Sequence, residues 1–151
     1  MRLQAHRIGA VSYVLWGLLH LVLGIVLVFG ITSTGGTTAL AVFGSGVPAE
    51  EWPQNLGGVT GGILAHYAWN LAVIGFVVAA VAATLNWTNS RLGYWLNLGL
   101  VTGVELGFLV EILLPGYMRL GPGLLAPILW AVAVVFSTIG YLTKPDASRP
   151  T

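Results

Sequence analysis

Residues 8–30 read IGAVSYVLWGLLHLVLGIVLVFG, a run of 23 residues without Asp, Glu, Lys or Arg. About 20 helical residues cross the hydrocarbon core of a bilayer, so this stretch predicts a membrane-spanning helix. Its apolar region is longer than the roughly 7–15 residues found in signal peptides, and no clear small-residue cleavage site follows it. We therefore expect it to be a retained helix.

Three further stretches are long and apolar enough to span a membrane. The four predicted spans cover residues 8–30, 61–86, 92–114 and 124–142. The chain is 56% hydrophobic and only 7% charged, and a soluble fold of this composition would expose large apolar patches. The links after the second and third spans are short, which favours antiparallel neighbours. The sequence thus predicts an all-α integral membrane protein, with one antiparallel four-helix transmembrane bundle over residues 1–151.

The basic residues orient this bundle. If the four spans alternate, Arg119 lies on one side, and the other side holds Arg2, Arg7, Arg91, Lys144 and Arg149. Positive residues favour the cytoplasm, so both termini are expected there, in a bacterial-type inner or plasma membrane. Residues 31–60 then form a long outer loop. They are either a surface loop with Trp52 anchored at the interface or a lid over the outward mouth of the bundle.

Several function classes are excluded by composition and motif content. A net charge of +1 without clustered Lys and Arg gives no support for nucleic-acid binding. The absence of cysteine excludes disulfides, thiolate metal sites and a Cys nucleophile. Neither a P-loop nor a GxSxG motif is present. In size and hydropathy the chain resembles small four-helix membrane families of the DoxX type, and no activity is carried over from that likeness.

The third span places two carboxylates in an apolar run, GVELGFLVEILLPGY at residues 103–117. An acid at the bilayer centre costs about 2.5–3.5 kcal/mol on insertion scales, so such residues usually face the bundle interior and serve a function. Glu105 has no Lys or Arg at its depth. We expect it either to be protonated or to pair with protonated His20. Glu111 lies about 9 Å further along the axis and could reach Arg119 or water.

A glycine ridge occupies another face of the same span. Gly99, Gly103 and Gly107 recur every four residues, which predicts close helix contact within the bundle or across a homodimer. Glu105 points about 160–200° away from the two later glycines.

Polar residues of three spans are predicted to share a pocket. By depth, His20 and Glu105 lie near the midplane, and His66 and Glu111 lie about 10–12 Å outward, with Asn70 between the two levels. The half of the bundle near the termini looks almost wholly apolar by comparison. We therefore predict a pocket that opens outward, with candidate catalytic residues Glu105, His20, His66 and Glu111 and candidate ligand-binding residues Asn70, Tyr13, Trp16, Trp69 and Arg119.

The chemistry of these residues favours binding of a hydrophobic, lipid-like small molecule or membrane lipid. Glu and His could add acid–base catalysis of an isomerase, cyclase or epoxide-opening type without a cofactor. The first alternative is a structural or assembly subunit of a membrane complex. Others are a small b-type haem protein that uses His20 and His66, although their depths differ by about 8–9 Å, and a proton-coupled transporter. A zinc site of these His and Glu side chains meets the same mismatch in depth, and we expect no metal.

Overall fold

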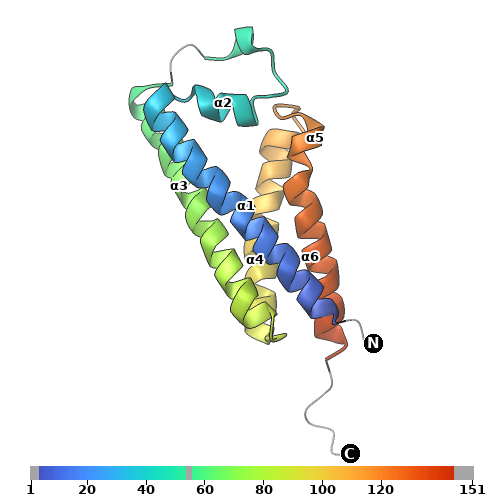
Figure 1. Ribbon diagram of the computed structural model, residues 1–151. Coiled ribbons are helices and arrows are strands. Elements are labelled where there is room, and N and C mark those ends of the chain that lie inside the picture. The colour runs from blue at the N-terminus through green and yellow to red at the C-terminus, as the bar shows by residue number, and fades with distance from the viewer. Residues whose placement is uncertain (1–3, 54–55, 145–151) are drawn as a thin grey trace, which may run out of the picture.

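The computed structural model describes residues 4–53 and 56–144, and within these ranges every regular element is a helix (Figure 1). Four helices are long and apolar enough to cross a membrane: Ala5–Thr34, Gly58–Asn86, Arg91–Leu113 and Leu120–Leu142. The prediction of an all-helical protein with four such spans is confirmed. The largest change of boundary is in the first helix, which extends from Ala5 to Thr34 instead of from residue 8 to residue 30.

The first helix, α1 (Ala5–Thr34), crosses the bundle diagonally (Figure 1). Its start lies against the end of α6 (Leu125–Leu142), where a Cβ at Gly140 would meet the backbone of His6. From Gly17 onward it packs on α3 (Gly58–Val81) through small residues. A Cβ added at Gly17 would lie 2.5 Å from the carbonyl oxygen of Gly75. Small residues permit this close approach of two backbones.

The second and third spans each end in a turn of π-helix. Helix α3 continues into η2 (Ala82–Asn86), and α4 (Arg91–Phe108) continues into η3 (Leu109–Leu113). The fourth span has a break near its start, between α5 (Leu120–Gly123) and α6. Pro127 lies in the first turn of α6, where a residue without an N–H is tolerated.

The connection between α1 and α3, residues 35–57, is shorter than the loop predicted at residues 31–60, and its described part includes helical turns. It contains α2 (Thr37–Phe43) and the short helix η1 (Ala49–Glu51). Ala39 packs with Leu27 and Ile31 of α1 in a hydrophobic cluster. The backbone N–H of Gly46 donates to the carbonyl of Tyr117 at 2.8 Å, so the connection is also tied to the link after η3.

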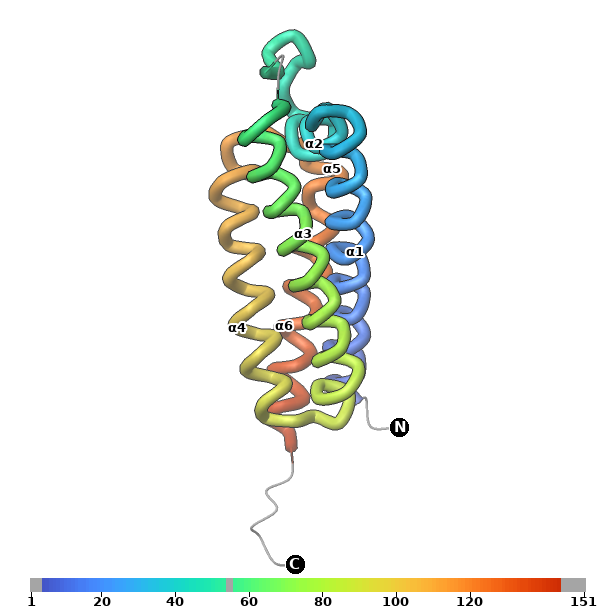
Figure 2. The backbone as a smooth tube through the Cα atoms, turned by 90° about the vertical axis from the view of Figure 1, so that its left-hand side faces the viewer, coloured from blue at the N-terminus to red at the C-terminus, as the bar shows by residue number. Residues whose placement is uncertain are grey.

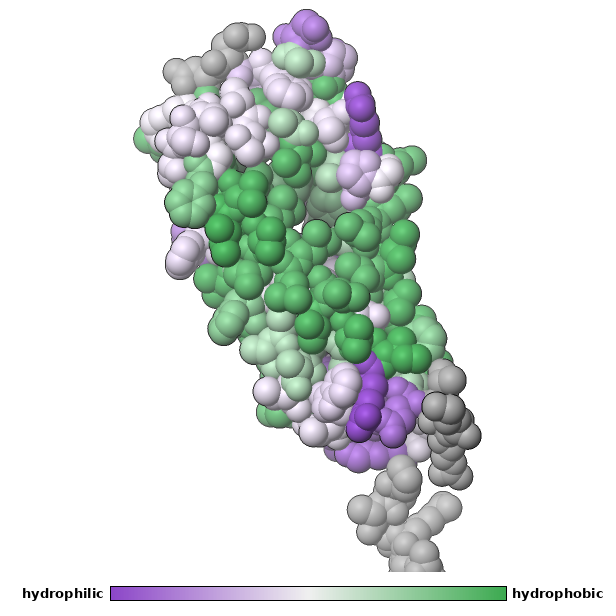
Figure 3. Space-filling view, in the orientation of Figure 1, coloured by the Kyte–Doolittle hydropathy of each residue, from purple (hydrophilic) through white to green (hydrophobic). Residues whose placement is uncertain are grey.

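The bundle is elongated, with α2 and the rest of this connection at one end (Figure 2). We call this the α2 end. The start of α1 and the end of α6 lie at the opposite end (Figure 1). A broad hydrophobic band covers the visible face between two more hydrophilic ends (Figure 3). This distribution fits a protein whose middle is surrounded by lipid.

Candidate functional site

A buried carboxyl group lies where α4 meets α1. Glu105 is only 1% exposed. Its Oε1 accepts a hydrogen bond from Nε1 of Trp16, an indole that is itself fully buried. The second oxygen, Oε2, is enclosed and has no hydrogen-bond partner among the residues that the structure describes. Most buried polar atoms in proteins are paired, so this oxygen calls for an explanation.

His20 completes the group, one turn along α1 from Trp16. Its Nδ1 lies 2.8 Å from the carbonyl oxygen of Trp16. Because a carbonyl only accepts, Nδ1 carries a proton, and in the neutral ring Nε2 is left as an acceptor. The imidazole also stacks on the indole, with ring centres 3.7 Å apart. We call Trp16, His20 and Glu105 the Trp16 cluster. His20 and Glu105 therefore both contact the Trp16 indole, and within the described ranges no hydrogen bond joins the two directly.

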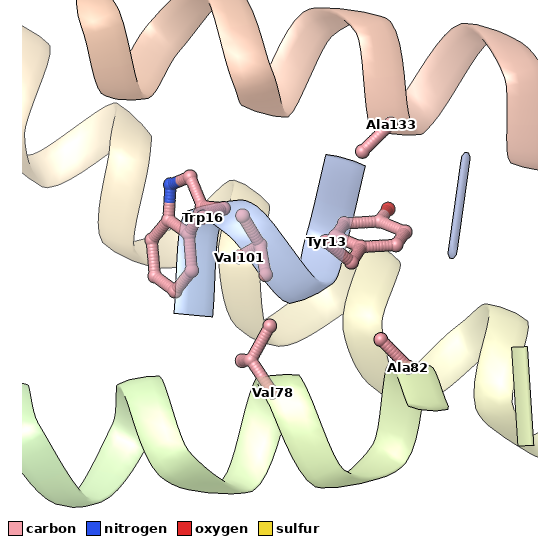
Figure 4. Packing of buried hydrophobic residues seen from close by; sticks show 6 residues of the cluster. All are labelled: Tyr13, Trp16, Val78, Ala82, Val101 and Ala133. Carbon is pink, nitrogen blue, oxygen red and sulfur yellow. The ribbon is translucent and has the colours of Figure 1, made fainter. Parts of the chain in front are cut away.

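Trp16 also belongs to a buried apolar core (Figure 4). This core consists of Tyr13, Trp16, Val78, Ala82, Val101 and Ala133. Tyr13 and Val101 precede Trp16 and Glu105 by about one turn on their helices, on the side of the start of α1. Both are fully buried. Packed side chains thus occupy the side of Glu105 that faces the start of α1. Tyr13, predicted to bind ligand, belongs to the core, and its hydroxyl has no partner.

His66 and Asn70 form a separate pair on α3. Asn70 Nδ2 lies 3.1 Å from His66 Nε2, and the His66 side chain is exposed. Both residues stand about 160° around the helix from Ala68, which packs against Gly24 of α1. They point away from the Trp16 cluster, and Trp69 beside them is 59% exposed. His66 and His20 therefore do not converge on a common point that could hold haem iron.

Glu111 and Arg119 are likewise outside the Trp16 cluster. Both side chains are exposed, and the part of the chain that is described contains no ion pair between them. Arg119 instead donates its backbone N–H to Ser45 Oγ at 3.2 Å. The nine residues predicted to form one pocket thus fall into separate groups. Within the described ranges, no group of three His, Asp or Glu side chains is placed to hold a metal ion.

Sequence reasoning underrated a second set of buried polar residues, nearer the start of α1. Asn97 Nδ2 donates to Asn86 Oδ1 at 3.0 Å and to the carbonyl of Val78 at 3.3 Å. Ser12 and Ser137 are also buried. The predicted contrast between a polar outer half and an apolar inner half is therefore weaker than expected. The signal was available, since Asn97, Val101 and Glu105 recur every four residues on one face of α4.

The glycine ridge faces away from the bundle. A Cβ added at Gly99, Gly103 or Gly107 would have no described atom of another element within 4 Å. The ridge lies on the side of α4 opposite Glu105. Because Glu105 points into the bundle, the ridge points out of it. Within the described ranges, the ridge thus makes no contact between helices.

The visible surface is hollowed below the α1–α3 connection, between α1 and the α5 side of the bundle (Figure 3). The connection lies above this hollow and joins the two sides through its bond to Tyr117. A molecule that approached the Trp16 cluster from the α2 end would pass beneath the α1–α3 connection.

Comparison with known proteins assigns no family to the chain. No family model matches the sequence, and neither a curated protein nor a solved structure gives a significant match. The function has to be inferred from the residues and their geometry.

Proposed function

We propose that the Trp16 cluster is an intramembrane binding site for a hydrophobic, lipid-like molecule that carries one polar group. The observation behind this proposal is the enclosed Glu105 Oε2 without a partner. Leaving a buried polar atom unsatisfied costs about 1–3 kcal/mol, and a polar group of a ligand would remove that cost. The surrounding apolar side chains suit the rest of such a molecule.

Glu105 is assigned as the neutral acid. No ion pair to this residue occurs within the described ranges, and an ionised carboxylate at this depth would cost about 2.5–3.5 kcal/mol. In this state Oε1 accepts from Trp16 and Oε2 carries a proton that it can donate to a ligand oxygen. His20 Nε2 is the complementary acceptor for a ligand hydroxyl.

Acid–base turnover is the enzymatic form of the same proposal. Glu105 would give a proton to the substrate, and His20 would remove one from another atom of it. Isomerisation, epoxide opening and cyclisation of a lipid-like substrate are reactions that such an acid and base could catalyse without a cofactor. His66, Asn70 and Glu111 are left out of the proton transfer, because they do not contact the Trp16 cluster.

The proposed topology is an antiparallel bundle with both termini in the cytoplasm of a bacterial-type cell. The α2 end would then face the outside, and the α1–α3 connection would act as a lid over the approach to Glu105. A ligand would enter from the outer leaflet or beneath this connection. The outward-facing glycine ridge on α4 would be covered by the same ridge of a second copy, because small residues allow two helices to approach closely.

A structural role is the competing function, and a specific observation favours it. The bond from Trp16 to Glu105 joins α1 to α4, so the buried acid could serve only to hold these helices together. In that case the chain would be a scaffold or an assembly subunit.

Replacing Glu105 by Leu separates the two functions. A Leu side chain is of similar size but offers neither an acceptor to the Trp16 N–H nor a donor to a ligand, whereas Gln would keep both through its amide. We would purify wild type, Glu105→Leu and Glu111→Leu from membranes and identify organic molecules that are retained, by mass spectrometry. Glu111→Leu is the matched control, since it removes an exposed carboxylate six residues away on the same span.

The binding proposal expects a ligand in wild type and in Glu111→Leu, reduced about tenfold or more in Glu105→Leu. Tenfold corresponds to about 1.4 kcal/mol, within the range for one lost buried hydrogen bond. Equal retention in all three proteins, or a loss of stability without a loss of ligand, would favour the structural role.

A further inference from the structure

An apolar groove of about 300 Å³ runs along the surface near the start of α1, away from the Trp16 cluster. It is lined by Val11, Val14, Leu15, Ala83 and Trp87. Val11, Leu15 and Trp87 are 46%, 50% and 43% exposed. The groove therefore opens onto the face of the bundle that meets lipid, and its occupant would come from the membrane.

A cation stands beside this groove. The guanidinium carbon of Arg7 lies 5.0 Å from the centre of the Trp87 ring. Arg7 is one turn before Val11, so it shares a stripe of α1 with the groove. A guanidinium held over an aromatic ring keeps in-plane N–H donors for another partner. In residues 4–53 and 56–144 these donors have no hydrogen-bond acceptor.

Arg7 and the groove together match the depth of one leaflet. Arg7 and Leu15 are eight residues apart on a continuous helix, which is about 12 Å along the axis. The hydrocarbon of a whole bilayer is about 30 Å thick, so one leaflet contributes about 15 Å. The groove lining on α1 begins at Val11, one turn after the cation, and ends at Leu15.

We propose that this groove binds one anionic phospholipid from the leaflet nearest the start of α1. One acyl chain lies along Val11, Leu15 and Ala83, and the phosphate accepts hydrogen bonds from Arg7. Arginine suits this role because its paired N–H groups match the geometry of a phosphate. The site shares no residue with the Trp16 cluster, so it stands or fails independently of the function proposed there.

The test uses the purified full chain, titrated with phosphatidylglycerol or phosphatidylcholine bearing the same oleoyl chains and observed by native mass spectrometry. Wild type should bind the first phosphatidylglycerol about fivefold more tightly, the effect of roughly one basic residue near an anionic surface. Arg7→Gln should abolish this preference. Arg91→Gln is the control, because it removes another exposed cation outside the groove. It should retain the preference.

A second variant tests the apolar part of the site. Val11→Trp places a large ring in the groove without disturbing the core, since Val11 is half-exposed, and should weaken binding of both lipids. Thermal unfolding should match that of wild type. The proposal is overturned if wild type shows no preference, if Arg7→Gln keeps it, or if Val11→Trp binds both lipids as wild type does. An equal loss in Arg91→Gln would also overturn it, because that result indicates diffuse surface attraction.

Discussion

The hydrogen bond between Trp16 and Glu105 can be measured with a double-mutant cycle. Trp16→Phe removes the N–H donor and keeps an aromatic ring against His20. Glu105→Leu removes the acceptor and keeps a side chain of similar size. The two single variants and the double variant together give the coupling energy between the two groups, because effects that do not involve the pair cancel.

The expected coupling follows from the assigned protonation state. Trp16→Phe alone leaves both oxygens of Glu105 without a partner, which costs about 1–3 kcal/mol in addition to lost apolar contact. The coupling isolates the bond itself. Hydrogen bonds between membrane helices average about 0.6 kcal/mol and reach about 1.7 kcal/mol. Bonds to charged groups are worth about 1.5–3 kcal/mol. For a neutral Glu105 we expect about 0.6–1.7 kcal/mol.

The assay is reversible unfolding of the purified chain in mixed micelles at neutral pH. A control cycle pairs Glu105→Leu with Trp95→Phe, because Trp95 is 54% exposed and has no bond to Glu105. Its coupling should be zero within about 0.5 kcal/mol. A coupling near zero for Trp16 and Glu105 would refute the hydrogen bond. A value above about 2 kcal/mol would refute the neutral acid, since it lies in the range for charged partners.

Three other predictions concern helix packing, the glycine ridge and topology. Gly17→Ala should destabilise the chain by about 1–3 kcal/mol, because its Cβ would press on the backbone of α3 at 2.5 Å. Gly103→Leu should leave the free energy of unfolding of the monomer within about 0.5 kcal/mol of wild type, and it should abolish a cross-linked dimer. Unchanged cross-linking would exclude the proposed glycine-ridge interface. Reporter fusions after Asn89 and after Thr151 should both report the cytoplasm, and a signal from the opposite side at either position would reject the topology.

The four spans could be predicted because length and hydropathy alone decide whether a helix crosses a membrane. The ends and the connection were harder. Helix α2 has only seven residues, too few for a clear periodic signal, and it is held by packing of Ala39 on α1. The π turn of η3 was also unpredicted. No residue type at 109–113 marks it, and it depends on backbone bonds such as Leu114 N–H to the carbonyl of Leu109.

The direction of a side chain could be predicted where the rotation of its residue around the helix was considered. It could not be predicted from the depth of the residue in the membrane alone. Glu105 was placed opposite the glycine ridge, and it is buried while the ridge faces outward. His66 was grouped with Glu111 because their depths agree. The alanines at positions 68 and 72 contact α1, however, and this contact turns His66 to the exposed side of α3. The depth of a residue gives its level in the membrane. The direction of its side chain depends on which face of the helix packs against a neighbouring helix.

Trp16 has a different part in the site from the one its sequence suggests. A buried indole beside a Glu and a His looks like a residue that binds ligand, but its N–H already donates to Glu105 and its ring carries His20. No donor on the indole is left for a ligand, because indole has a single N–H. A bound molecule would instead meet Oε2 of Glu105 and Nε2 of His20. Trp16 fixes the positions of both groups, so its replacement should disturb the acid and the base together.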